Sequence, residues 1–150
     1  MAGLTQAMTT SFKVELLKGL HDFSFGADAM YIALFKANAS ITGTYGAATT
    51  NYSNMTGNTD ETTGANYTAG GNLLVNVTPI ATGTTAFCDF GDTTWSTATV
   101  TSRGALIYNT TNADSAVAVL DFGADKTSTA GDFSIIFPTA DSANAIIRIA

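Results

Sequence analysis

The clearest element in the pattern of apolar and polar positions is a β-hairpin in the second half of the chain. Strands near residues 100–108 and 115–122 flank the polar turn NTTNAD. Two apolar runs of this length around turn residues are typical of paired antiparallel strands. Both strands are apolar on both faces, whereas a sheet with one solvated face should alternate apolar and polar residues. Either another part of the chain or another subunit must therefore cover the second face.

Strand alternation assigns the hairpin side chains to the two faces. In the second strand it places Ala116 and Ala118 on one face and Val117 and Val119 on the other. The two valines are candidates for contact with another subunit if the chain itself leaves their face open.

The hairpin also carries one basic and one acidic residue that can meet across the strands. If Tyr108 pairs with Ala116, Arg103 lies directly across from Asp121. Opposite charges at such positions attract each other. The register therefore predicts an ion pair between Arg103 and Asp121.

Further strands are indicated by short apolar runs between Gly, Pro and Asn residues. They lie near residues 28–39, 72–78, 84–90, 132–138 and 144–150. In the first of these, Met30, Ile32 and Leu34 point to one face and Ala33 and Phe35 to the other. Residues 123–131 are predicted to be a turn region, and residues 40–71 a long irregular segment that is either functional or poorly ordered.

The N-terminal part is predicted to hold an arm and one short helix. Residues 1–10 have no charged side chain and little pattern, which indicates an arm that is ordered only when something binds it. In the segment SFKVELLKGL, Ser11 can cap a helix and Gly19 can end it. Four apolar residues fall on one face of this helix and are candidates for contact with a sheet or a partner: Phe12, Leu16, Leu17 and Leu20.

These elements predict the fold class. We expect an all-β protein, an antiparallel sandwich or jelly roll of seven to eight short strands with one short N-terminal helix. The length of 150 residues fits an arm over residues 1–10 and a single β-domain over residues 11–150.

Charge and composition argue against two classes of partner. The net charge is −6 and the six basic residues are scattered, which is the opposite of a nucleic-acid-binding surface. No apolar run approaches the roughly 20 residues that a membrane helix needs, and the N-terminus does not look like a secretory signal. We expect a protein that binds neither nucleic acid nor membrane.

The residue types that carry chemistry show no catalytic pattern. His21 is the only histidine, and beside Asp22 at the end of the helix it is expected to be a surface or capping residue. Cys88 is the only cysteine and is expected to be a small buried side chain in a strand. Five of the aspartates are expected at strand ends and turns, where they bond the local backbone, and the stretches DETTG and DFGADK do not match a calcium loop. We therefore expect no catalytic residue, no cofactor and no metal.

Most of the chain resembles a known group of proteins. The segments that carry the resemblance are SFKVELLKGLHDF, YTAGGNLL, TTAFCDFGDTTWSTATVTSRGALIYN, AVAVLDFGADK and FSIIFPTADSANAIIRIA. They are similar to small virion structural proteins of tailed bacteriophages. The resemblance implies a non-enzymatic capsid decoration, or cement, protein that binds the outside of the head and stabilises the shell. It further implies the major capsid protein as partner, a homo-oligomer with a trimer favoured, synthesis in the host bacterial cytoplasm and a final location in the virion.

Two alternatives remain open at this point. One is a tail, neck or fibre component that contacts the host surface, with the segment 40–71 binding glycan. The other is a carbohydrate-active hydrolase that uses a pair of aspartates. In either virion role, the aromatic side chains that we expect at an interface are Tyr45, Tyr52, Tyr67 and Trp95.

Overall fold

The computed structural model describes residues 2–150 and confirms the all-β class. The strands are β1 (Gly3–Leu4), β2 (Ala7–Met8), β3 (Met30–Leu34), β4 (Thr44–Tyr45), β5 (Asn72–Leu73), β6 (Asn76–Thr82), β7 (Thr85–Phe90), β8 (Thr93–Asn109), β9 (Ser115–Ile135) and β10 (Ile147–Ile149). The helices are α1 (Thr10–Leu17), α2 (Tyr52–Gly57) and a short 3-10 turn, η1 (Asn38–Ser40). The strands are less uniform than expected, because β8 and β9 have 17 and 21 residues and several others only two.

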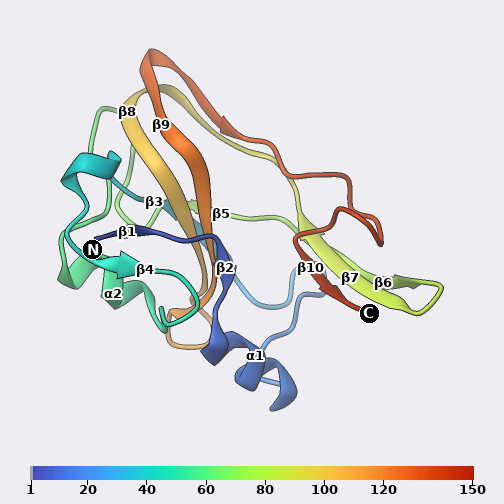
Figure 1. The fold of residues 1–150 in the computed structure, drawn as a ribbon. Coiled ribbons are helices and arrows are strands. Elements are labelled where there is room, and N and C mark those ends of the chain that lie inside the picture. The colour runs from blue at the N-terminus through green and yellow to red at the C-terminus, as the bar shows by residue number, and fades with distance from the viewer. Residues whose placement is uncertain (1) are drawn as a thin grey trace.

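Two antiparallel sheets form the body of the molecule. The larger has five strands in the order β2-β9-β8-β3-β5, and the smaller has three in the order β10-β7-β6. A two-residue parallel pair joins β1 to β4. In Figure 1 the long β8–β9 hairpin stands in the middle, with β1, β4 and α2 on one side and the smaller sheet on the other. The five-stranded sheet is thus an inner layer with material on both faces.

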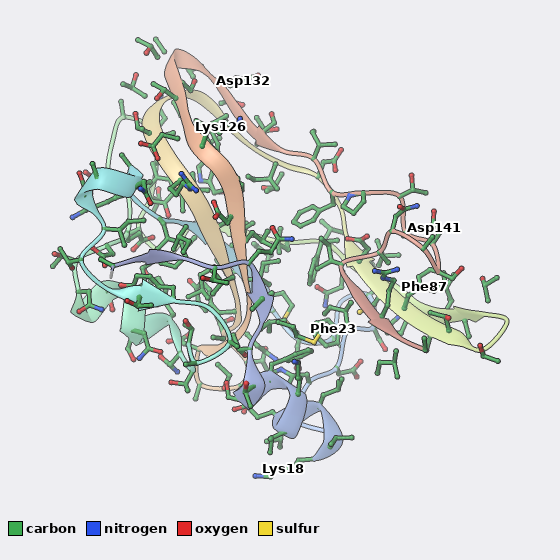
Figure 2. All side chains as sticks on the ribbon, in the orientation of Figure 1. Lys18, Phe23, Phe87, Lys126, Asp132 and Asp141 are labelled. Carbon is green, nitrogen blue, oxygen red and sulfur yellow. The ribbon has the colours of Figure 1, made fainter. Side chains whose placement is uncertain are left out.

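The main core fills the space between the two sheets. Met30, Ile32 and Leu34 of β3 point into it, as the alternation predicted, and meet Cys88 and Phe90 of β7. The same cluster contains Phe12 of α1 and Phe23, and Figure 2 shows Phe23 between α1 and the smaller sheet. Apolar burial on this scale is the main force that holds the two sheets together.

The second face of the large sheet is covered by the same chain. Ala33 and Phe35, together with Leu106 of β8, form a second buried cluster. Tyr45 and Met55, from the long segment between β3 and β5, close it from outside. The segment 40–71 is therefore not an irregular loop free to bind ligands over its whole length, since part of it packs on the sheet.

A β-bulge at Val117 changes the face of the residues around it. Ile107 pairs with Ala118 and Tyr108 with Ala116, so Val117 is an extra residue on its strand. Val117 and Ala118 consequently both point into the main core. The prediction that Ala116 and Ala118 share a face is wrong for this reason.

The hairpin is also longer than predicted. Residues 123–131 are part of β9 and do not form a turn region, because the strand bends at two register shifts and resumes its pairing with β8 at Lys126 and at Gly131. Gly123 and Ala130 have positive φ values of 75° and 48°, which fits these bends. Figure 1 shows β8 and β9 curving over together at their upper end.

The N-terminal arm is bonded to the body. β1 pairs with β4, and β2 pairs with Val119 and Ala118 of β9. Helix α1 then begins after Thr9, whose side chain accepts a hydrogen bond from the Phe12 N–H. The cap is therefore Thr9, where the sequence favoured Ser11, while the predicted end near Gly19 is right.

Candidate functional site

Five of the predicted interface residues lie in the core of the single chain. They are Phe12, Tyr45, Trp95, Val117 and Val119, all at most 4% exposed. Because the chain itself covers both faces of the large sheet, no partner can reach these side chains in this fold. Their assignment to an interface is corrected to a place in the core.

The leucines of the helix behave differently from one another. Leu16 packs against the main core, whereas Leu17 is 90% exposed and Leu20, just beyond the helix, is 46% exposed. Val14 on the same helix is also about half exposed. The helix therefore docks through Phe12 and Leu16 and presents the other apolar side chains to solvent.

Tyr52 and Tyr67 are half-buried and share one carboxylate. Their hydroxyls donate to the two oxygens of Glu61, at 2.5 Å from Tyr52 and 2.7 Å from Tyr67. Tyr52 also stacks on Tyr108 with ring centroids 4.5 Å apart. Burial, followed by the nearby Glu61 charge, raises the pKa of Tyr52 and of Tyr67. These contacts hold the segment after β4 on the sheet. Both tyrosine hydroxyls are already used in hydrogen bonds to Glu61.

His21 is buried, which corrects the expectation of a surface residue. Its Nε2 lies 2.9 Å from Glu15 Oε2 and its Nδ1 lies 2.9 Å from Asn109 Nδ2. Asn109 Nδ2 also donates to Asp28 Oδ2 at 2.7 Å. These bonds fasten the end of α1 to the end of β8. The group resembles a catalytic relay in its residue types, but among the described residues its hydrogen bonds join it to no serine or cysteine that could act as a nucleophile.

The most enclosed carboxylate is that of Asp60, which has no exposed surface. It accepts hydrogen bonds from the N–H groups of Thr42 and Gly43 and from the Tyr45 hydroxyl, the last two at 2.7 Å. Burial alone would raise the pKa of Asp60, but these hydrogen bonds outweigh it and hold the pKa below its ordinary value. Asp60 thus holds Thr42, Gly43 and Tyr45 together within the segment that packs on the second face of the large sheet.

The predicted ion pair between Arg103 and Asp121 is present. Arg103 Nε donates to Asp121 Oδ1 at 2.7 Å. The bulges shift the register, so that Asp121 pairs with Gly104 where Arg103 was expected directly across. The hydrogen bond from Arg103 is the main reason that the pKa of Asp121 is lowered.

The remaining candidates for chemical reactivity are buried in the fold. Cys88 is buried in β7, as predicted, and burial raises the pKa of its thiol to about 12. Asp89 beside it is 1% exposed, and burial raises the pKa of its carboxyl. Among residues 2–150, no group of three or more His, Cys, Asp or Glu residues could hold a metal ion.

Most of the large exposed apolar side chains lie on α1, the loop after it and the segment through β6, while Ile136 and Ile149 lie elsewhere. We call this region the α1–β6 surface, and its residues are Val14, Leu17, Leu20, Phe25, Leu73, Val75 and Ile80. The two parts are joined where the Phe25 N–H donates to Thr78 Oγ1 of β6 at 3.0 Å. In Figure 1, α1 and the β6–β7 hairpin both project from the body. Exposed apolar residues grouped in this way mark protein–protein contact sites.

A second candidate site is a cleft along β9. Two hollows of about 510 and 440 Å³ share Phe122, Ile135 and Ile136. Lys126 and Asp132, labelled in Figure 2, line the first hollow and are exposed to solvent. The α1–β6 surface holds more exposed apolar side chains than this cleft.

Sequence reasoning found part of the α1–β6 surface and missed the rest. Leu17 and Leu20 were among the candidates, whereas Phe25, Leu73 and Val75 were not. The signal for Phe25 was its place in the short stretch SFGA, where an apolar side chain sits in a turn. Leu73 and Val75 were hidden because they alternate with Leu74, which is buried, in a run that simply predicts a strand.

Comparisons with known proteins place the chain beside none of them. No family model, curated protein or solved structure matches it. Within the described residues, no helix is long and apolar enough to cross a membrane. The functional argument therefore rests on the residues themselves.

Proposed function

We propose that this chain is a non-enzymatic structural protein of a phage virion, a capsid decoration protein that binds the outside of the head. The observation that carries the proposal is the α1–β6 surface, where Leu17 and Phe25 are 90% and 73% exposed. Side chains of this kind gain free energy when a partner covers them. As the partner we propose the major capsid protein, which the resemblance noted in the sequence implies.

The self-contained core supports the same proposal. A decoration protein is added to a finished shell, so it has to fold before it meets its partner. Both faces of the large sheet are covered within one chain, which makes such independent folding possible. Association with other copies, for which a trimer is favoured, would use surfaces outside these two faces.

The test is to count the copies of the chain on the particle. Virions of the phage that encodes it are separated into heads and tails, and the chain is quantified by mass spectrometry against the major capsid protein. The proposal predicts hundreds of copies, all with the heads. A few copies that travel with the tails would overturn it and favour a tail or neck component.

A pair of variants links the location to the α1–β6 surface. Leu17→Ser should reduce binding to undecorated heads about tenfold, since it removes a large exposed apolar contact. Ile136→Ser is the matched control, because Ile136 is 70% exposed but lies outside the surface. Equal binding by both variants would show that the heads are contacted elsewhere.

A further inference from the structure

One hollow within the α1–β6 surface has the chemistry of a specific site. It has a volume of about 280 Å³ and lies between residues 25–29 and residues 73–76. Phe25, Leu73 and Val75 line it, and they are 73%, 57% and 56% exposed. Its walls are therefore apolar and open to a partner.

The hollow is also lined by a buried amide side chain, Asn76, of which one half is unpaired. Asn76 is 5% exposed, and its Nδ2 donates to the backbone oxygen of Asp28 at 3.0 Å. Its Oδ1 is buried and accepts no hydrogen bond from the described residues. An unpaired buried amide oxygen is costly, but this one has almost no accessible surface, so a donor from outside would have to meet the neighbouring Asp28 instead.

The charge of the hollow indicates which kind of hydrogen-bond donor it favours. Asp28 lines it, and its Oδ2 accepts hydrogen bonds from the Asp22 N–H at 2.9 Å and from Asn109 Nδ2 at 2.7 Å. No hydrogen bond to its Oδ1 is formed within residues 2–150, and none of the residues that line the hollow is basic. The hollow thus carries a negative charge and one acceptor oxygen, Asp28 Oδ1, that a partner could reach.

We propose that this hollow receives an arginine side chain of the protein on which the chain docks. A guanidinium carries five N–H donors and a delocalised charge, and it is more weakly hydrated than an ammonium. It can also stack on the exposed ring of Phe25, while its methylene stem covers Leu73 and Val75. The inference rests on the proposed docking role, but the binding itself is a property of the isolated chain.

An apolar anchor fits the hollow less well. A leucine from the partner would cover the walls but would bury the Asp28 carboxylate without a donor or an opposite charge. A lysine supplies charge and donors, but it presents a compact ammonium with no flat face for Phe25. The order of preference is therefore arginine, then lysine, then an apolar side chain.

The test uses the full chain, labelled for NMR, and three small probes. These are the N-acetyl, N-methylamide derivatives of arginine, lysine and norleucine. The arginine probe should give saturable shifts at the Leu73 and Val75 methyl groups and at the Asn76 side-chain amide. The lysine probe should bind about fivefold more weakly and norleucine should not saturate. Equal shifts from all three probes, or none at these groups, would overturn the inference.

Two variants locate the binding. Phe25→Leu keeps an apolar wall but removes the ring, and it should weaken the arginine probe about fivefold. Asp28→Asn should weaken it by a similar factor, and this effect should fade with added salt. Leu17→Ala lies outside the hollow and should bind the probe like the original chain. Since Phe25 is largely exposed, its variant remains informative if Asp28→Asn fails to fold.

The outcomes separate this inference from the proposed function. Binding of the arginine probe, together with a few copies on tails, would keep the site and remove the decoration role. Hundreds of copies on heads, with no saturable binding of the probe, would keep the role and remove the site.

Discussion

Among single residues, the buried Asp60 connects several parts of one segment through hydrogen bonds. Its buried carboxylate gathers donors from Thr42, Gly43 and Tyr45, three residues of the segment that covers the second sheet face. Hydrogen bonds to a charged group are stronger than those between neutral groups. The position of this cover therefore depends on one side chain.

Asp60→Asn should lower the free energy of unfolding at pH 7 by roughly 2–3 kcal/mol, because the amide supplies one acceptor oxygen and no charge. The pKa of Asp60 is lowered in the folded chain. Its contribution is therefore complete above the unfolded value of about 3.9 and is lost as the pH falls through the folded value. Urea unfolding between pH 7 and pH 3 should show the gap between the two proteins closing below about pH 4.

Asp114→Asn is the matched control for this experiment. Asp114 lies in the β8–β9 turn with φ 59°, a conformation that asparagine tolerates. It should unfold like the original chain at every pH. A gap for Asp60→Asn that stays constant down to pH 3 would contradict the account of its charge.

Gly71 provides a second test at this scale. Its φ is +74°, and a Cβ there would lie 1.8 Å from the backbone oxygen of Ile32 in β3. Gly83 has a similar φ of +60° with open space around it. Gly83→Ala should cost about 1–2 kcal/mol from the backbone conformation alone, and Gly71→Ala at least twice that. Equal costs in chemical denaturation would show that β3 moves aside freely.

Local patterns predicted single residues well only where the structure depends on neighbours in the sequence. The alternation in β3 and the burial of Cys88 follow from strand periodicity. The burial of His21 does not, since it depends on Asn109, which lies 88 residues away along the chain. A lone histidine beside an aspartate carries no signal for such a distant partner.

At the scale of elements, the bulge at Val117 shows where strict alternation along a strand no longer predicts which face a side chain occupies. The run AVAVL is apolar throughout, so nothing in it shows where one residue is added to the strand. The same holds for residues 123–131, whose Gly, Asp and Thr residues are typical of turns. In the structure these residues bend the strand at two register shifts, and the pairing with β8 resumes after each of them.

The N-terminal arm gives a prediction at this scale. Deletion of residues 2–8 should lower the free energy of unfolding by roughly 2–4 kcal/mol, from lost strand pairing and apolar burial. The Gly3 and Thr5 N–H groups donate to Gly43 and Tyr45, and Leu4 packs on the second cluster. Thermal or urea unfolding measures the loss, and Leu4→Ala, which keeps the backbone pairing, should show only part of it. An unchanged stability would mean that the arm waits for a partner.

At the scale of the whole molecule, the sequence predicted that both faces of the hairpin are covered but did not predict what covers the second one. Apolar residues on both faces of the hairpin required a cover, and the chain or another subunit could supply it. The choice depended on whether Tyr45 and Met55 return to the sheet, which is a long-range contact that the polar composition of their segment conceals. The same packing moved five interface candidates into the core and left the α1–β6 surface exposed.

The central claim is that the chain docks through the α1–β6 surface, and hydrogen–deuterium exchange tests it most directly. Exchange is measured by mass spectrometry on the free chain and on the chain bound to heads. The account predicts new protection in residues 10–29 and 72–82, with residues 41–60 and the strands β8 and β9 unchanged. Protection along the outer edge of β9, with residues 10–29 exchanging as in the free chain, would contradict it.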